Sequence, residues 1–265
     1  MEFTKMEGLG NDYIYLNCLQ ERPADPAKLA RILSDRHFGV GGDGLICICP
    51  GRGGDFFMEM YNADGSRGAM CGNGIRCLGK YVYDKGLTDR RCLTVDTDSG
   101  PKLLELHVKG EKVESVTVNM GRVVLLPWVE ENWEDRRLRL YPVLVGNPHA
   151  VCFCENPDDY PLEEIGPALE HSRRLGRRSN IEFVSVPAED VLSVRVWERG
   201  SGVTLACGTG ACAAFEAARR AGLCGERAEV RLPGGVLQVE ARQGEVWLTG
   251  PARTLFEGHW QGGSI

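Results

Sequence analysis

The sequence predicts an α/β fold, of the mixed α+β kind, in which two similar halves each wrap a mixed β-sheet around a central helix. Short strand-like runs alternate with a few helical segments along the chain. A Cys-Gly-x-Gly sequence opens a helical segment twice, at Cys71 and at Cys207. The separation of these cysteines is 207 − 71 = 136 residues. Together these observations indicate two copies of one supersecondary unit.

The same offset relates two further pairs of polar residues. Asn11 in GLGNDY corresponds to Asn147 in LVGNPH, because 147 − 11 = 136. Asn62 at the end of one strand corresponds to Glu198 at the end of another, because 198 − 62 = 136. Three landmarks at one ungapped offset predict an internal duplication. The first half is therefore expected over 1–120 with Cys71, and the second over 121–265 with Cys207; the tail after residue 250 is expected to cross back to the first half.

The individual elements follow from hydrophobic period and from turn residues. Period-2 alternation, or apolar β-branched and aromatic runs broken by Gly, Pro and Asn, predicts the strands. Their ranges are Tyr13–Cys18, Leu45–Cys49, Phe56–Tyr61, Leu93–Thr97, Ser115–Asn119, Ala150–Cys154, Ile181–Val186, Leu192–Trp197, Glu229–Leu232, Val236–Ala241 and Glu245–Thr249. Helices are predicted over Pro26–Arg36, Gly72–Lys85, Leu162–His171 and Gly208–Ala221. The last is Ala-rich and ends at Gly222, and its small residues favour close packing inside a sheet.

Composition excludes several classes of protein. The 265 residues carry a net charge of −6, which argues against nucleic acid or an anionic membrane as partner. No apolar run reaches the roughly 18 residues that a membrane span requires, and the N-terminus has no apolar run of the secretory type. The eleven cysteines are odd in number in a long chain, so we expect reduced thiols in a cytoplasmic protein rather than a disulfide scaffold.

The short cysteine pairs are interpreted as strand residues. Cys47–Cys49 and Cys152–Cys154 lie in apolar runs, where alternation sends both cysteines of a pair to one face. No CxxC pair is present, and the five histidines do not form a cluster beside a cysteine pair. The sequence therefore predicts no metal, and the glycine-rich stretch at Gly39–Gly44 does not match a dinucleotide fingerprint, so we expect no cofactor.

Cys71 and Cys207 are the candidate catalytic groups. A cysteine directly before a helix meets unpaired backbone N–H groups, which favour thiolate over thiol and can bind a carboxylate. Two such loops facing each other would place one thiol on each side of a carbon atom, as inversion of a stereocentre requires. The expected function is thus cofactor-independent racemisation or epimerisation of an amino acid. Cys77 and Cys212 fall further into the same helices and are expected to be packed and inert.

Two other classes of function are compatible with these residues. A proline-racemase-like or histidine-racemase-like enzyme would share the thiol pair and accept a different amino acid. A thiol redox or metal protein would contain bound metal or a working Cys71–Cys207 couple. Racemisation assays across amino acids would identify the first class by the amino acid that it accepts. Elemental analysis of the purified protein would identify the second class by its bound metal.

At these residues the chain resembles the diaminopimelate epimerase family, over nearly its whole length. The motifs that carry the resemblance are KMEGLGNDY, YNADGSRGAMCGNGIRC, VGNPHAV, SNIEFV and WERGSGVTLACGTGACA. The resemblance implies interconversion of LL- and meso-diaminopimelate in lysine and peptidoglycan synthesis, by an isomerase that forms a homodimer. It makes Cys71 and Cys207 the base and acid. It also implies that His149 and Glu198 steer the reacting amino and thiol groups.

The resemblance also implies a set of substrate contacts. These are Asn62, Asn147, Asn180 and Arg199, with Asn11 beside them and with the backbone at Gly72–Asn73 and Gly208–Thr209 cradling the reacting carboxylate. The chain departs from the family in two places. Gly44 stands where many members have glutamine, and Leu175–Ser179 (LGRRS) is more basic than usual. Both departures concern the distal part of the substrate site.

Overall fold

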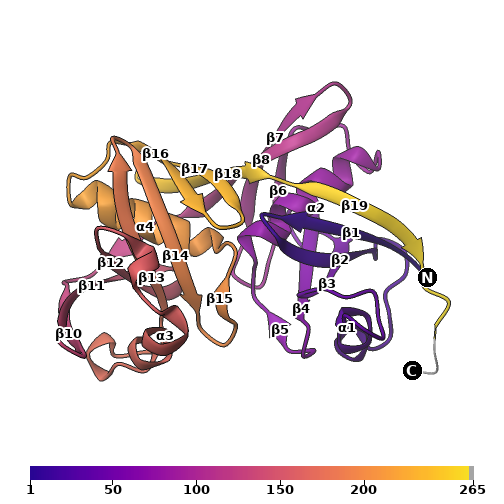
Figure 1. Cartoon of the computed structure of the whole chain (residues 1–265). Helices are drawn as coiled ribbons and strands as arrows, with labels where there is room; N and C mark the ends of the chain where they lie inside the picture. Colours follow the sequence, from indigo (N-terminus) through magenta and orange to yellow (C-terminus); the bar gives the residue numbers. More distant parts are fainter. Residues whose placement is uncertain (263–265) are drawn as a thin grey trace. The chain divides into compact units, whose positions relative to one another are not determined.

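The computed structural model describes residues 1–262, which form two compact units. The first unit contains Met1–Val118 and the chain from Gly250 onward, and the second contains Asn119–Thr249. In each unit, β-strands wrap around one central helix, α2 (Gly72–Asp84) in the first and α4 (Gly208–Arg220) in the second (Figure 1). This arrangement confirms the predicted fold class.

The other elements fall into these two units. The first holds β1 (Glu2–Gly8), β2 (Asn11–Asn17), α1 (Pro26–Ser34), β3 (Gly44–Pro50), β4 (Phe56–Asn62), β5 (Arg67–Gly68), β6 (Cys92–Asp96), β7 (Lys102–Lys109), most of β8 (Lys112–Gly121) and β19 (Arg253–His259). The second holds β9 (Val124–Leu125), β10 (Val129–Trp133), β11 (Arg136–Val145), β12 (Asn147–Phe153), α3 (Leu162–Glu170), β13 (Asn180–Ala188), β14 (Val191–Glu198), β15 (Gly202–Thr204), β16 (Arg227–Leu232), β17 (Gly235–Arg242) and most of β18 (Glu245–Pro251), with 3-10 turns at Pro157–Asp159 and Arg173–Leu175.

The two units share one strand topology. In the first, β2 is parallel to β3, β3 antiparallel to β4, β4 parallel to β6, and β6 antiparallel to β7. In the second, β12, β13, β14, β16 and β17 repeat that series of parallel and antiparallel pairs. The offset of 136 also relates the starts of the helices, since α1 begins at residue 26 and α3 at 162. The structure thus shows the duplication that the cysteine spacing predicts.

Both central helices are buried because their residues are small where strands approach. In α2, a Cβ atom on Gly79 would lie 2.9 Å from Leu106 Cδ2. In α4, the alanines from Ala211 to Ala218 are at most 1% exposed. Substituting larger side chains would force the surrounding strands apart, so the small residues fix how tightly each sheet closes on its helix.

The predicted helices agree with the structure to within two residues at each end, and every predicted strand lies within or overlaps an observed one. Several strands were not predicted. The longest of these are β1, β7, β11 and β19. The sequence of β11, for example, is RRLRLYPVLV. β19 pairs with β1, yet five of its seven residues are exposed in succession, which leaves no alternation to detect.

Three of the four paired cysteines lie in strands, as predicted, and Cys154 directly follows the end of β12. Cys47 and Cys49 of β3 both belong to the core cluster that packs against Leu29 and Leu33 of α1. Cys152 of β12 lies in the equivalent cluster beside α3, and Cys154 packs against that cluster. These thiols fill core volume as small apolar groups.

Candidate functional site

Cys71 begins α2 as its N-cap. Its backbone is extended (φ −129°, ψ 122°), and its Sγ accepts a hydrogen bond from the N–H of Gly74 at 3.3 Å. Gly72 and Asn73 form the first turn and are both buried. The cysteine side chain is only partly buried. A polarised sulfur at the positive end of a helix and open to solvent is placed for acid–base work.

Asn11 connects Cys71 to a charged network. The Cys71 thiol donates to Asn11 Oδ1 at 3.2 Å, and Asn11 Nδ2 donates to Asp43 Oδ2 at 2.7 Å. Asp43 also accepts from Arg36, which pairs in turn with Asp12 at 2.8 Å. The amide of Asn11 is therefore held in one orientation, with its oxygen toward the sulfur.

Asn62 lies at the end of β4, directly paired with Gly44 of β3. Its Nδ2 donates to Ser66 Oγ at 2.9 Å, and the N–H of the next residue, Ala63, donates to the carbonyl of Asp43 at 3.0 Å. A Cβ atom at Gly44 would lie 2.1 Å from the carbonyl oxygen of Tyr61. The strand pairing at this point leaves no room for a side chain, which is a physical reason for glycine in place of glutamine.

Cys207 is the N-cap of α4 with nearly the same geometry as Cys71. Its φ and ψ are −119° and 113°, and its Sγ accepts from the N–H of Gly210 at 3.3 Å. The sulfur also lies 3.4 Å from Thr209 Oγ1 and 3.9 Å from Asn180 Nδ2. Gly208 follows as the first, buried residue of the helix. The two half-sites thus share the cap and differ in the surrounding polar groups.

The electrostatic environment of Cys207 corrects one expectation. A helix N-terminus predicts an acidic thiol, but burial raises the pKa of Cys207 well above its ordinary value, and the nearby carboxylates of Glu198 and Glu182 add to this rise. The hydrogen bonds with Thr209 and with the backbone N–H of Gly210 oppose this rise without cancelling it.

His149 forms a buried pair with a carboxylate that the sequence did not single out. His149 Nδ1 lies 2.6 Å from Glu182 Oε1, and both side chains are 0% exposed. His149 Nε2 lies 3.0 Å from Asn147 Oδ1, and Asn147 Nδ2 donates to Thr209 Oγ1 at 3.4 Å. A continuous set of polar contacts therefore runs from Glu182 through the histidine to the first turn of α4.

Glu198 and Arg199 follow the end of β14. Burial raises the pKa of Glu198, while the hydrogen bond from Thr204, at 2.5 Å from its Oε1, opposes that rise. The N–H of Arg199 donates to Asn180 Oδ1 at 2.9 Å, and its guanidinium reaches the carbonyl of Arg178 at 3.4 Å. Glu198, Arg199 and Asn180 are thus brought together in the same half-site as Cys207.

Glu170 at the end of α3 holds two of these segments. Its carboxylate accepts from Arg178 Nε at 2.8 Å and from Trp197 Nε1 at 2.8 Å. Burial would raise the pKa of Glu170, but the hydrogen bonds from Trp197 and Arg178 lower it below its ordinary value. Arg178 lies two residues before Asn180, and Trp197 directly precedes Glu198. This buried anion fixes the spacing of both site-bearing segments.

Sequence reasoning missed Asp43, Glu170 and Glu182. Asp43 lies within the glycine-rich stretch that was set aside because it does not fit a nucleotide fingerprint. Glu182 did carry a signal, since it is a charged residue in the apolar run NIEFV. A charge at an inward position of a buried strand is rare unless it is paired. Glu170 gave no comparable signal, because it ends an amphipathic helix.

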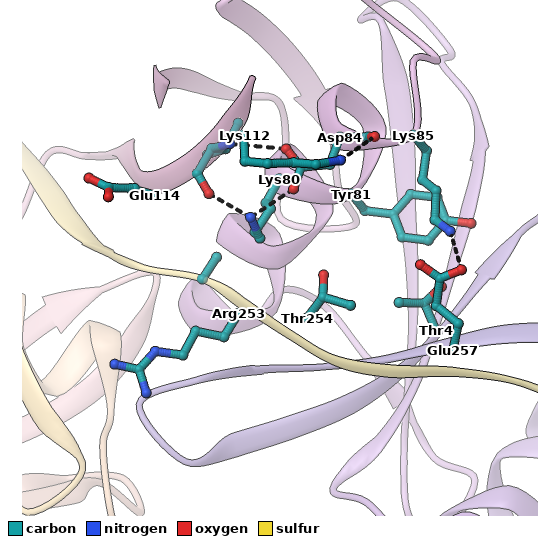
Figure 2. A pocket seen from close by; sticks show the side chains of 12 residues that line it. Thr4, Lys80, Tyr81, Asp84, Lys85, Lys112, Glu114, Arg253, Thr254 and Glu257 are labelled. Carbon is teal, nitrogen blue, oxygen red and sulfur yellow. Dashed lines mark hydrogen bonds and ion pairs between the residues drawn. The ribbon is translucent and has the colours of Figure 1, made fainter. Parts of the chain in front are cut away.

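One hollow of the first unit contains none of the predicted site residues. It has a volume of about 670 Å³ and lies between α2, β8 and β19 (Figure 2). Two of its lysines form ion pairs, Lys80 with Asp84 at 2.7 Å and Lys85 with Glu257 at 2.5 Å.

Two absences apply to the part of the chain that the structure describes. Over residues 1–262, no group of three or more His, Cys, Asp and Glu side chains is arranged to bind a metal ion. Within the same range, no helix is long and apolar enough to cross a membrane.

The fold and the paired cysteine caps define a class of protein with two similar α/β halves. Two solved structures share this fold at 14% sequence identity. A probable proline racemase from Agrobacterium radiobacter superposes with a TM-score of 0.73, covering 98% of this chain and 92% of that one. A phenazine biosynthesis protein of the PhzF family from Bacillus anthracis superposes with a TM-score of 0.77, covering 97% and 98%. At this identity the likeness concerns the fold alone.

Sequence comparison defines the family. The diaminopimelate epimerase family model matches residues 3–126 and 141–255. A relative from Acetivibrio thermocellus named diaminopimelate epimerase is 47% identical, over 97% of this chain and 98% of that protein. The chain belongs to the diaminopimelate epimerase family.

Proposed function

We propose that this protein is a cofactor-independent isomerase that interconverts LL- and meso-diaminopimelate. The observation that carries the proposal is the repeated cap, in which Cys71 and Cys207 each accept a backbone N–H at 3.3 Å at the start of a buried helix. Family membership supports the choice of substrate. Such an enzyme would serve lysine and peptidoglycan synthesis in the cytoplasm, and we expect it to act as a homodimer.

In the proposed reaction, the two half-sites work on opposite faces of one α-carbon. One cysteine, as thiolate, removes the α-proton, and the other, as thiol, delivers a proton from the opposite face. The resting thiol at Cys207 fits the acid role for one of the two stereoisomers. Backbone N–H groups at Gly72–Asn73 and Gly208–Thr209 would bind the carboxylate and stabilise the charge that develops on it.

The remaining site residues would bind the two amino-acid heads. His149 and Glu198 would orient the reacting amino and thiol groups. Arg199 presents a planar guanidinium that can bind a carboxylate with two hydrogen bonds, and Asn62, Asn147 and Asn180 supply both donors and acceptors. Asn11 keeps its carbonyl toward Cys71 and would tune that thiol rather than hold the distal head.

The test is a panel of substrates with purified protein. LL-diaminopimelate should be converted to the meso isomer, while proline, histidine and one-headed amino acids should react far more slowly. Equal or faster racemisation of proline or histidine would instead identify a related racemase. Stoichiometric bound metal that is required for turnover would contradict the cofactor-independent mechanism.

A further inference from the structure

The pair formed by His149 and Glu182 is present in only one of the two duplicated halves. Subtracting 136 places Tyr13 at the position of His149 and Ile46 at the position of Glu182. The strand registers agree, because Glu182 pairs with Val151 and Ile46 pairs with Tyr15, and 151 − 15 = 136. The second half therefore carries a carboxylate where the first carries an isoleucine.

The helices confirm that these two side chains occupy equivalent places. A Cβ atom on Gly74 of α2 would lie 2.7 Å from Ile46 Cδ1. A Cβ atom on Gly210 of α4 would lie 2.8 Å from Glu182 Oε1. The fold accepts an apolar side chain at this position, so packing does not require the glutamate. A fully buried carboxylate costs several kcal/mol unless it is paired, which points to a role in the chemistry.

The contacts of the pair fix the orientation of the histidine ring. Asn147 Nδ2 donates to Thr209 Oγ1, and Asn147 Oδ1 lies 3.0 Å from His149 Nε2. On its other side, the ring meets a carboxylate oxygen at 2.6 Å. Polar partners at both nitrogens hold the ring in one orientation. Glu182 Oε2 is buried without a hydrogen-bond partner among the described residues, so the ring is the carboxylate's one compensating contact.

The groups around the ring come from each packed element. They are Asn147 on the same strand, Glu182 on β13, Glu198 on β14, Cys207 at the start of α4, and the apolar Val143 opposite on β11. Among these groups, Glu182 contacts the ring at Nδ1 and Asn147 contacts it at Nε2.

From these contacts we propose that Glu182 is a positioning residue that holds the His149 ring through Nδ1, so that Nε2 is directed toward Asn147 and the first turn of α4. This deepens the proposed function and rests on it for its catalytic meaning. A ring that is fixed in one orientation keeps the polar groups of the Cys207 cap in place for the reaction.

The first test is independent of turnover. Crystal structures of wild type and of Glu182→Ile show the orientation of the His149 ring directly. In wild type, Nδ1 should contact Glu182 and Nε2 should contact Asn147. In Glu182→Ile the ring should turn and lose its contact with Asn147, and Glu182→Asp should retain it. A ring that keeps its contact with Asn147 in Glu182→Ile overturns the proposal.

The second test separates positioning from simple structural support. Glu182→Ile reproduces the first half's residue and should keep the fold, as judged by its melting temperature. We expect Glu182→Gln and Glu182→Ile to lower kcat about 10²-fold, the usual size of a lost proton-transfer effect, with little change in KM. Glu182→Asp should recover part of the loss. The matched control is Glu216→Gln, a buried carboxylate on α4 that pairs with Arg219 and should keep wild-type activity.

The outcomes for the two proposals are distinguishable. If wild type fails to convert diaminopimelate yet Glu182→Ile displaces the His149 ring, the substrate assignment is wrong and the role of Glu182 in holding the ring stands. If wild type converts the substrate and Glu182→Gln turns over normally, the epimerase function stands and the role of Glu182 is wrong.

Discussion

At the scale of single residues, each half-site depends on a cysteine whose sulfur takes the place of the usual N-cap oxygen. Sulfur accepts the N–H of the third helical residue at 3.3 Å in both units. The same helices carry Cys77 and Cys212, which are 1% and 0% exposed. Burial raises the pKa of Cys77 to about 12, and it also raises the pKa of Cys207, so burial alone does not distinguish the two kinds of cysteine. The N-cap position, at which the sulfur accepts a backbone N–H, distinguishes Cys71 and Cys207 from the packed cysteines.

Cys71→Ala and Cys207→Ala should each abolish epimerisation and leave the folded protein intact. Cys77→Ala and Cys212→Ala should keep near-normal turnover and lose about 0.5–2 kcal/mol of stability through lost packing. Initial rates of meso-diaminopimelate formation, together with urea unfolding, measure both effects. An Ala variant at Cys71 or Cys207 with full turnover would show that the two-cysteine assignment is wrong.

A second residue-scale prediction concerns Glu59 in the first unit. Hydrogen bonds from Arg22, Tyr61 and Arg67 lower the pKa of Glu59 from 4.5 to about 2, against the opposing effect of burial. A depressed carboxyl pKa stabilises the fold above the unfolded pKa, and this stabilisation is lost as pH falls from about 4.5 to about 2. Urea unfolding of wild type and Glu59→Gln should differ above pH 5 and converge toward pH 2. A constant difference across that range would refute the linkage.

At the scale of elements, α3 supports the Cys207 half-site through the residues that flank it. Gly166 in this helix meets the indole of Trp197, and a Cβ atom there would lie 2.4 Å from Trp197 Cδ2. The indole also donates to Glu170, which binds Arg178. The contact at Gly166 thus fixes how closely β14 packs against α3, and with it the position of Glu198 and Arg199 after Trp197.

Gly166→Ala should destabilise the protein although alanine favours helices. The gain in helix propensity is about 1 kcal/mol, whereas overpacking against a rigid ring costs about 1–3 kcal/mol. We expect a lower melting temperature and a lower kcat for the variant. Gly53→Ala is the control, because its Cβ would meet nothing within 4 Å. A Gly166→Ala protein as stable and active as wild type would show that this packing is not required.

The sequence allowed the helices, many strands and the paired cysteines to be predicted because these depend on local signals. Caps, alanine runs and the offset of 136 residues are visible without tertiary contacts. β19 could not be predicted, since its residues are exposed and its strand form depends on pairing with β1. Glu182 and Asp43 were missed for a related reason: whether a carboxylate is buried and paired depends on residues distant in sequence, such as His149 and Asn11.

At the scale of the whole molecule, the duplication gives two similar units with unequal chemistry. Equivalent positions hold Tyr13 and Ile46 in one unit and His149 and Glu182 in the other. The Cys71 thiol donates to an asparagine carbonyl, whereas Cys207 is surrounded by carboxylates. Such asymmetry suits a reaction whose two directions use opposite protonation states of the two thiols.

The proposed facing arrangement of the cysteines predicts a specific oxidation product. With substrate bound, each sulfur should lie about 3–3.5 Å from the α-carbon, too far apart for a disulfide bond of about 2.05 Å. Substrate-free enzyme treated with oxidised glutathione should lose activity through a Cys71–Cys207 disulfide, and reductant should restore it. Saturating substrate should protect. Peptide mapping that pairs either cysteine with Cys77 or Cys212 would contradict the facing arrangement.

Deuterium uptake is the sharpest test of a mechanism with one thiol on each face of the carbon. LL-diaminopimelate is incubated with the enzyme in D₂O, and both isomers are recovered at low conversion for NMR and mass analysis. Because the delivering thiol exchanges with solvent before it acts, the meso product should carry one deuterium at the inverted carbon while recovered substrate remains protiated. Equal early labelling of substrate and product, or transfer of the original hydrogen to the product, would mean that a single group serves both faces.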